Sequence, residues 1–156
     1  LNSMGAGVWG SVFFALFALM IIISRPLVGK VYARYGSRFV IYPGVGLFIV
    51  GLAILGVVST PVGIICTAPL LGLGYGAAQP AFQALAVQSA PIERAGVSTA
   101  TYFLALDIAV GAGSVILALI ANALGYQSLY QITSLIMIIA LALYHFVIRK
   151  HSYIAE

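Results

Sequence analysis

Residues 5–24 read GAGVWGSVFFALFALMIIIS, and no side chain in this run carries a charge. A helix needs about 20 apolar residues to cross the hydrocarbon core of a bilayer. Further apolar runs of similar length follow at about residues 39–58, 62–87, 97–122 and 129–148. Their residues do not alternate between apolar and polar, as the strands of a membrane barrel do. We therefore expect an all-α integral membrane protein with five transmembrane helices.

The composition excludes several other classes of protein. Of the 156 residues, 63% are hydrophobic and 6% are charged, whereas a soluble domain has about 25% charged residues. The net charge of +4 does not indicate nucleic-acid binding, because the basic residues cluster at the ends of apolar runs without interleaved aromatics. Cys66, the single cysteine, lies inside an apolar run, which excludes a disulfide framework and a CxxC metal site. We expect no metal, no cofactor and no enzymatic dyad or triad.

The start of the chain gives two further expectations. The first apolar run is too long for a cleavable signal peptide and is followed by Arg25 and Pro26. We expect the first helix to stop at this pair. The chain begins with Leu1 and not with Met, so we also expect a preceding part of the protein.

The basic residues predict the orientation of the helices. All seven lie in the connector 25–38, in the loop 88–96 (QSAPIERAG) or in the tail after residue 148. The opposite connections, 1–3, 59–61 and 125–128, contain no Lys or Arg. Loops rich in Lys and Arg stay on the cytoplasmic side of a membrane. We therefore expect a multi-pass protein of the cell membrane whose basic loops and C-terminus are cytoplasmic.

Asp107 lies near the middle of the run 97–122, where an ionisable side chain costs roughly 2.5–3.5 kcal/mol. We expect its helix face to pack on other helices or to line a cavity. Desolvation favours the neutral acid over the carboxylate, which makes Asp107 a candidate for proton or cation coupling. The alternative is a buried Asp that bonds to a neighbouring helix for structure alone. At roughly 100° per residue, the face also holds Gly96, Ala100, Phe103, Gly111, Ser114, Ala118 and Asn122.

The run 62–87 carries a similar stripe. Gly72 and Gly76 are spaced by four residues, which permits close approach of two helices. Tyr75, Gln79 and Gln83 share this face, and their donors and acceptors can orient a ligand in a cavity. Helix packing is the alternative interpretation of the whole stripe. Pro80 is a candidate flexing point.

The connector 25–38, RPLVGKVYARYGSR, resembles the loop motif G-x-L-x-D-R-x-G-R-[RK] of major facilitator superfamily transporters. Gly29, Arg34, Gly36 and Arg38 fall on its glycine and basic positions, whereas Ala33 replaces its acidic residue. This departure suits the degenerate second copy of the motif, between helices eight and nine. Segments 72–80, 91–96 and 106–113 look like helices ten and eleven of drug-efflux-type members.

The resemblance implies that residues 1–156 are helices eight to twelve of a twelve-helix transporter, a partial C-terminal six-helix bundle. Its missing N-terminal half is then a partner. The implied function is proton-coupled efflux of small amphipathic compounds by alternating access between two halves. Asp107 would contribute to coupling, and Tyr75, Gln79, Gln83 and Tyr102 to the substrate cavity. Basic residues hold helix ends at an anionic membrane surface, so Arg25, Arg34 and Arg38 would anchor or gate the cytoplasmic side, with Gly29 and Gly36.

A function of another class remains open. In a non-transporting membrane subunit, the small-residue faces would serve helix assembly alone. An intramembrane enzyme is the third alternative, and it lacks a recognisable catalytic pair in the sequence. If the protein is a non-transporting membrane subunit, Asp107 would tolerate replacement by Asn and the protein would bind no small molecule.

Overall fold

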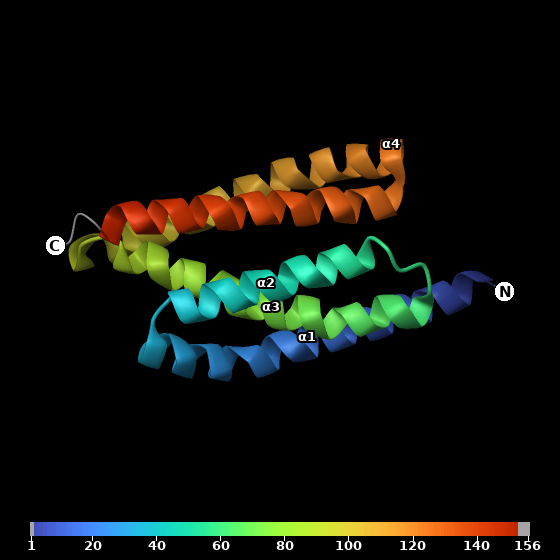
Figure 1. Ribbon diagram of the computed structural model, residues 1–156, viewed down its shortest axis with the longest axis horizontal. Coiled ribbons are helices and arrows are strands. Elements are labelled where there is room, and N and C mark those ends of the chain that lie inside the picture. Colours follow the sequence, from blue (N-terminus) through green and yellow to red (C-terminus); the bar gives the residue numbers. More distant parts are fainter. Residues whose placement is uncertain (1, 153–156) are drawn as a thin grey trace.

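The computed structural model describes the backbone of residues 2–152 and the side chains of residues 7–146. The described part is a bundle of long helices (Figure 1). Its elements are α1 (Asn2–Tyr35), α2 (Arg38–Leu55), α3 (Pro61–Gln88), the short 3-10 helix η1 (Ile92–Arg94) and α4 (Ala95–Ser152). The expectation of an all-α fold is confirmed for these residues, which form no strand.

The first helix is much longer than predicted. It was expected to stop at Arg25 and Pro26, but α1 continues through Pro26 to Tyr35. Proline removes one backbone hydrogen bond, whereas a lipid-exposed loop would leave many backbone groups unpaired, so membrane helices tolerate it. The turn comes at Gly36, which has a φ of 84° and donates its N–H to the Tyr32 carbonyl at 2.9 Å. This positive φ at the helix end favours glycine.

The count of spans also differs from the prediction. Four helices in the described residues are long and apolar enough to cross a membrane, not five. The difference lies in α4, whose Gly125 has the non-helical angles φ 82° and ψ 165°. At this residue the helix folds back on itself (Figure 1). We call residues 95–124 the first arm and residues 126–152 the second arm of α4. The predicted fourth and fifth runs correspond to these arms.

α3 packs against both α1 and α2, and its glycines make the close contacts. A Cβ atom at Gly72 would lie 2.6 Å from the Phe17 carbonyl oxygen of α1. At Gly74 it would lie 2.6 Å from the backbone nitrogen of Phe48 in α2. Gly72 belongs to the predicted stripe, and its close approach to α1 agrees with the helix-packing interpretation, whereas Gly74 lies outside that stripe. Buried apolar residues of α1, α2 and α3 form the core, namely Val28, Val40, Ile41, Val45, Leu52, Leu55, Leu71 and Ala81.

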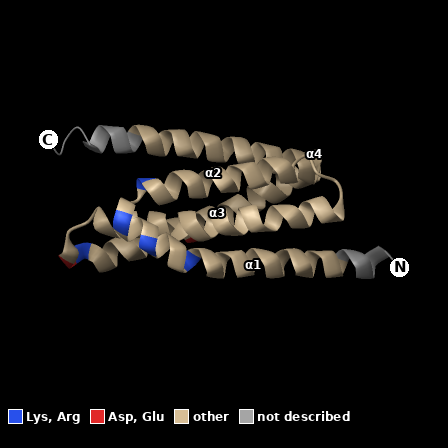
Figure 2. Cartoon of the chain, turned by 60° about the horizontal axis from the view of Figure 1, so that its bottom comes forward, with Lys and Arg blue, Asp and Glu red and all other residues tan. Residues whose placement is uncertain are grey.

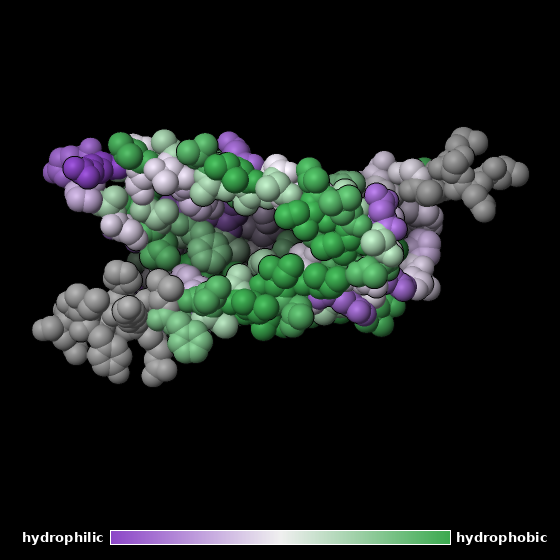
Figure 3. Space-filling model, turned by 90° about the horizontal axis from the view of Figure 1, so that it is seen from above, coloured by the Kyte–Doolittle hydropathy of each residue, from purple (hydrophilic) through white to green (hydrophobic). Residues whose placement is uncertain are grey.

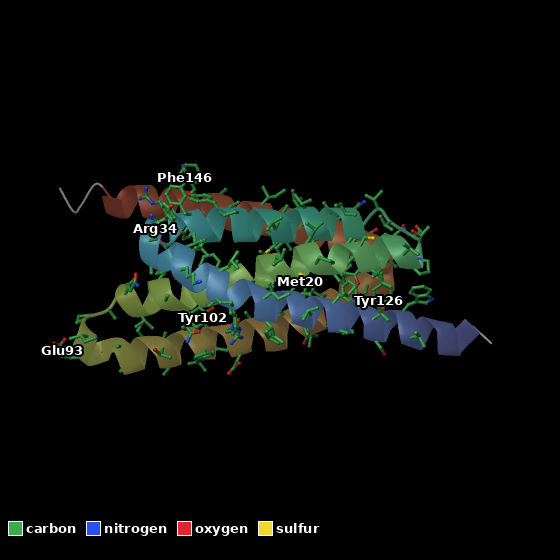
Figure 4. The ribbon with its side chains drawn as sticks, turned by 90° about the horizontal axis from the view of Figure 1, so that it is seen from below. Met20, Arg34, Glu93, Tyr102, Tyr126 and Phe146 are labelled. Atoms are coloured by element: carbon green, nitrogen blue, oxygen red, sulfur yellow. The ribbon has the colours of Figure 1, made fainter. Side chains whose placement is uncertain are left out.

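Charge is distributed unequally along the bundle. The Lys and Arg residues in the described part of the chain lie toward one end (Figure 2). Arg34 and Glu93 lie toward this end, and Tyr126 lies toward the other (Figure 4). The side chains of Arg149 and Lys150 lie outside the described residues. Between the ends, hydrophobic side chains predominate on the face seen in Figure 3. Helices with such a surface are suited to lipid contact.

Candidate functional site

A cavity of about 540 Å³ lies between α1, α3 and the first arm of α4. Ligand pockets commonly have volumes of about 300–1,000 Å³. The cavity is lined by Arg25, Val28, Gly29, Tyr32 and Ala33 of α1, by Gln79, Pro80, Ala81, Gln83 and Ala84 of α3, and by Phe103 of α4.

Helix periodicity brings these side chains to one place. Arg25, Gly29 and Tyr32 follow one face of α1, because residues three and four apart are neighbours on a helix. Gln79 and Gln83 are related in the same way on α3. Gln79 and Gln83, which were predicted to line a cavity, therefore share one cavity with Arg25 and Gly29 of the predicted loop motif. The sequence had assigned these two groups to separate places.

The length of α1 explains this meeting. Arg25 precedes the last residue of α1, Tyr35, by ten residues, and Gln79 precedes the last residue of α3, Gln88, by nine. At 1.5 Å per residue, both lie roughly 13–15 Å inside the ends of their helices. The prediction that the first helix ends at Arg25 was wrong. As a consequence, Arg25 belongs to the helical part of α1, where its side chain is exposed and lines the cavity.

Tyr102 connects two walls of the cavity without lining it. Its O–H donates to the backbone carbonyl of Gln79 at 3.2 Å. Ser98, one turn earlier, donates its O–H to the Ala86 carbonyl at 2.6 Å. Figure 4 shows Tyr102 where the first arm of α4 runs beside α3. These bonds place Phe103, the next residue, against the cavity. Phe103 was noted in the sequence only as a residue on the Asp107 face.

Tyr75 lies elsewhere on α3. Its ring centroid is 6.2 Å from that of Phe17 in α1 and 6.2 Å from that of Phe48 in α2. The side chain is 40% exposed and is not among the residues that line the cavity. The structure therefore brings Gln79 and Gln83 together in the cavity and leaves Tyr75 apart from them.

Asp107 is exposed on the first arm of α4, one turn beyond Phe103. Of the face predicted to pack on other helices or to line a cavity, Phe103 lines the cavity, whereas Asp107 itself does not. A Cβ atom at Gly111, on the same face, would meet nothing within 4 Å. Other residues, among them Tyr102 and Leu106, make up the half-buried side of this arm. The hydrogen bonds to α3 turn this side inward, and the helix period alone does not specify that rotation.

The remaining motif residues lie near the basic end. The Arg34 guanidinium lies 5.6 Å from the ring centroid of Tyr35. Arg38 begins α2 and borders a second cavity, of about 430 Å³, with Phe39, Tyr42 and Pro43. Their anchoring or gating roles stay predictions. In the described residues, His, Cys, Asp and Glu do not gather in groups of three that suit a metal ion.

One contact at this end was not anticipated. The O–H of Tyr32 donates to Oε1 of Gln88 at 3.1 Å and connects α1 to the last residue of α3. Tyr32 also borders the cavity. Its place within the loop motif was the available signal, but that segment was expected to be a connector and not a helix.

The family model described as Major Facilitator Superfamily matches residues 2–154. The chain belongs to this superfamily. The superfamily is one of membrane transporters. A curated protein similar to this major facilitator chain is an uncharacterized MFS-type transporter of Methanocaldococcus jannaschii. The two are 25% identical over 123 residues, which are 78% of this chain and 31% of the relative. The chain thus spans about a third of that relative's length. No solved structure matches it.

Proposed function

We propose that this chain is the C-terminal part of a transporter that moves a small molecule by alternating access. The substrates are small amphipathic compounds, exported from the cell in exchange for protons. The length of the relative supports this view, because the chain covers only 31% of it. An N-terminal half would supply the other side of the transport pathway.

The observation that carries the proposal is the cavity between α1, α3 and the first arm of α4. It combines polar side chains, among them Gln79 and Gln83, with the aromatic ring of Phe103. Mostly apolar walls with a few polar groups are typical of small-molecule sites. The walls belong to three different helices, so a relative movement of these helices would open or close the site.

The proposal also includes five crossings of the cell membrane. Each arm of α4 would be one crossing, with the turn at Gly125 on the outer side. The basic end of the bundle would then be cytoplasmic, following the positive-inside rule. In this orientation Arg34 and Arg38 would anchor the cytoplasmic side, and Gly36 would allow the turn between α1 and α2.

Asp107 would couple transport to protons. Asp107 is exposed and a Cβ atom at Gly111 would meet nothing within 4 Å, so this part of the face would line the aqueous pathway between the two halves. Asp107→Asn in the full-length protein removes the titratable carboxyl with little change in size. In proteoliposomes with an imposed pH gradient, we expect gradient-driven transport to be abolished and membrane insertion to be normal.

The matched control is Glu93→Gln, which removes a carboxyl from the exposed η1 outside the predicted spans. We expect this variant to transport at the wild-type rate. Unchanged gradient-driven transport in Asp107→Asn would remove the assignment of Asp107. Loss of substrate exchange without a gradient would indicate a role in binding or structure and not in coupling.

A non-transporting assembly subunit is the second candidate. The unpacked face around Gly111 favours it, since small residues without neighbours in the chain suit contact with another subunit. This candidate requires that the purified full-length protein binds no small molecule and that Asp107→Asn has no functional effect. Substrate flux in proteoliposomes would exclude it.

A further inference from the structure

We propose that the cavity between α1, α3 and the first arm of α4 binds an organic anion, and that Arg25 determines this specificity. The inference rests on the proposed transport function and names the class of substrate. The ligand is a carboxylate, sulfonate or phosphate group on an apolar body. Arg25 is the residue that pairs with the anionic group.

The charge of the cavity carries the argument. Among the lining residues of the described chain, Arg25 alone is charged. Ala33 stands at the acidic position of the loop motif and also lines the cavity. At this position the cavity wall therefore has a methyl group and not a carboxylate. Asp107 lies one turn beyond Phe103 and forms no ion pair with Arg25. The cavity is therefore electropositive and unsuited to an organic cation.

The depth of Arg25 makes an anionic ligand favourable. Arg25 lies ten residues before the last residue of α1, and its side chain is exposed in the described chain. No hydrogen bond or ion pair to it exists within the described side chains. Inside the proposed membrane crossing, such a charge needs a partner of opposite charge with good hydrogen-bond geometry. A guanidinium supplies five donors in a planar fork that fits carboxylate and phosphate oxygens in pairs.

The other walls define the rest of the ligand. The amides of Gln79 and Gln83 offer both donors and acceptors, which fix orientation without adding charge. Phe103, Val28 and Pro80 supply apolar surface on the three helices. A volume of about 540 Å³ accepts a molecule of one or two rings. Together these features select an amphipathic anion.

The test uses the purified full-length protein in lipid nanodiscs and two probes of similar shape, 1-naphthoate and its uncharged amide, 1-naphthamide. Wild-type protein should bind the carboxylate more tightly. Arg25→Gln should weaken naphthoate binding about 30-fold, because truncating one partner of a desolvated charge pair has a large cost. Binding of naphthamide should change by less than about twofold. Arg25→Lys should have an intermediate effect, since it keeps the charge without the planar fork.

Lys30→Gln is the matched control, because Lys30 is an exposed basic residue of α1 outside the cavity lining. It should bind both probes as the wild type does. The double variant Arg25→Gln/Asp107→Asn separates ligand binding from simple neutralisation of Asp107. It should remain as weak as Arg25→Gln, and recovery of naphthoate binding in the double variant would overturn the proposal.

Equal affinity of the wild type for both probes, or no binding of either, would also overturn it. A full-length protein that transports neutral or cationic compounds independently of Arg25 would overturn the anion specificity alone. A protein that transports and binds nothing would overturn the proposed function itself.

Discussion

α3 and the first arm of α4 have similar sequences and different surroundings. Both are apolar helices with glycines and polar residues spaced along one face. In α3 the glycines meet other helices, with a Cβ at Gly74 placed 2.6 Å from the Phe48 backbone nitrogen. In the first arm of α4, a Cβ at Gly111 or Gly113 meets nothing within 4 Å. The glycines of α3 thus allow close packing with other helices, whereas Gly111 and Gly113 have no neighbouring helix within 4 Å of such a Cβ in the described chain.

The difference shows what a stripe of small residues specifies. Small residues permit close approach of a neighbour, but they do not say whether the neighbour belongs to the same segment of chain. In α3 the neighbours are α1 and α2. For the first arm of α4, the chain spans only 31% of its relative's length. We expect the free face to be used in the full-length protein, toward the transport pathway.

The largest effect should come from adding a methyl group to each stripe. Gly72→Ala in the full-length protein should cost about 2 kcal/mol of stability, because the backbones of α1 and α3 must separate. Gly111→Ala should change stability by less than about 0.5 kcal/mol. Thermal unfolding of the detergent-purified variants measures both. Equal losses would show that the first arm of α4 is packed as tightly as α3 in the whole protein.

A second comparison concerns water on the two sides of the first arm. Ser114 shares the Asp107 face, and Ile116 lies opposite and is 56% exposed. In a cysteine-free full-length background, Ser114→Cys should react about tenfold faster than Ile116→Cys with a membrane-impermeant thiol reagent. Thiolate forms readily only where water reaches the thiol. Similar rates at the two positions would contradict an aqueous pathway along this face.

The smallest effect concerns the connection between the two helices. Tyr102→Phe removes the hydrogen bond to the Gln79 carbonyl and keeps the ring. Hydrogen bonds between membrane helices contribute about 0.6 kcal/mol on average, so the thermal midpoint should fall only slightly. Thr101→Val is the control, since the Thr101 hydroxyl bonds within its own helix, to the Val97 carbonyl. A larger loss in the control would contradict the role of Tyr102 as a connection between helices.

Much of the fold was predictable because lipid imposes a simple rule. Backbone groups must be paired inside the membrane, so long apolar runs become helices. The predicted run 62–87 lies within α3 (Pro61–Gln88), and the run 39–58 overlaps α2 (Arg38–Leu55). The error at Arg25 and Pro26 has the same physical basis. A charged residue and a proline end many helices in water, but here the helix continues for a further nine residues after Pro26.

The site was predictable only in part. Gln79 and Gln83 were selected because uncharged donors and acceptors on one helix face can orient a ligand, and both line the cavity. Arg25 was assigned to the loop motif because it follows an apolar run. Its place beside these amides depends on how far α1 continues and on which face it turns to α3. Asp107 was expected on a face that packs on other helices or lines a cavity, and its side chain is exposed in the described chain.

By itself, the sequence determined that this protein lies in a membrane, that it is helical and which end carries the charge. These properties follow from composition and from the positions of single residues along the chain. They do not depend on contacts between distant parts of the chain. The tertiary structure decided that Arg25 lines one cavity with Gln79 and Gln83, that α3 packs against both α1 and α2, and that Asp107 is exposed in the described chain. Such pairings depend on helix rotation and register, which arise from contacts among residues distant in the chain.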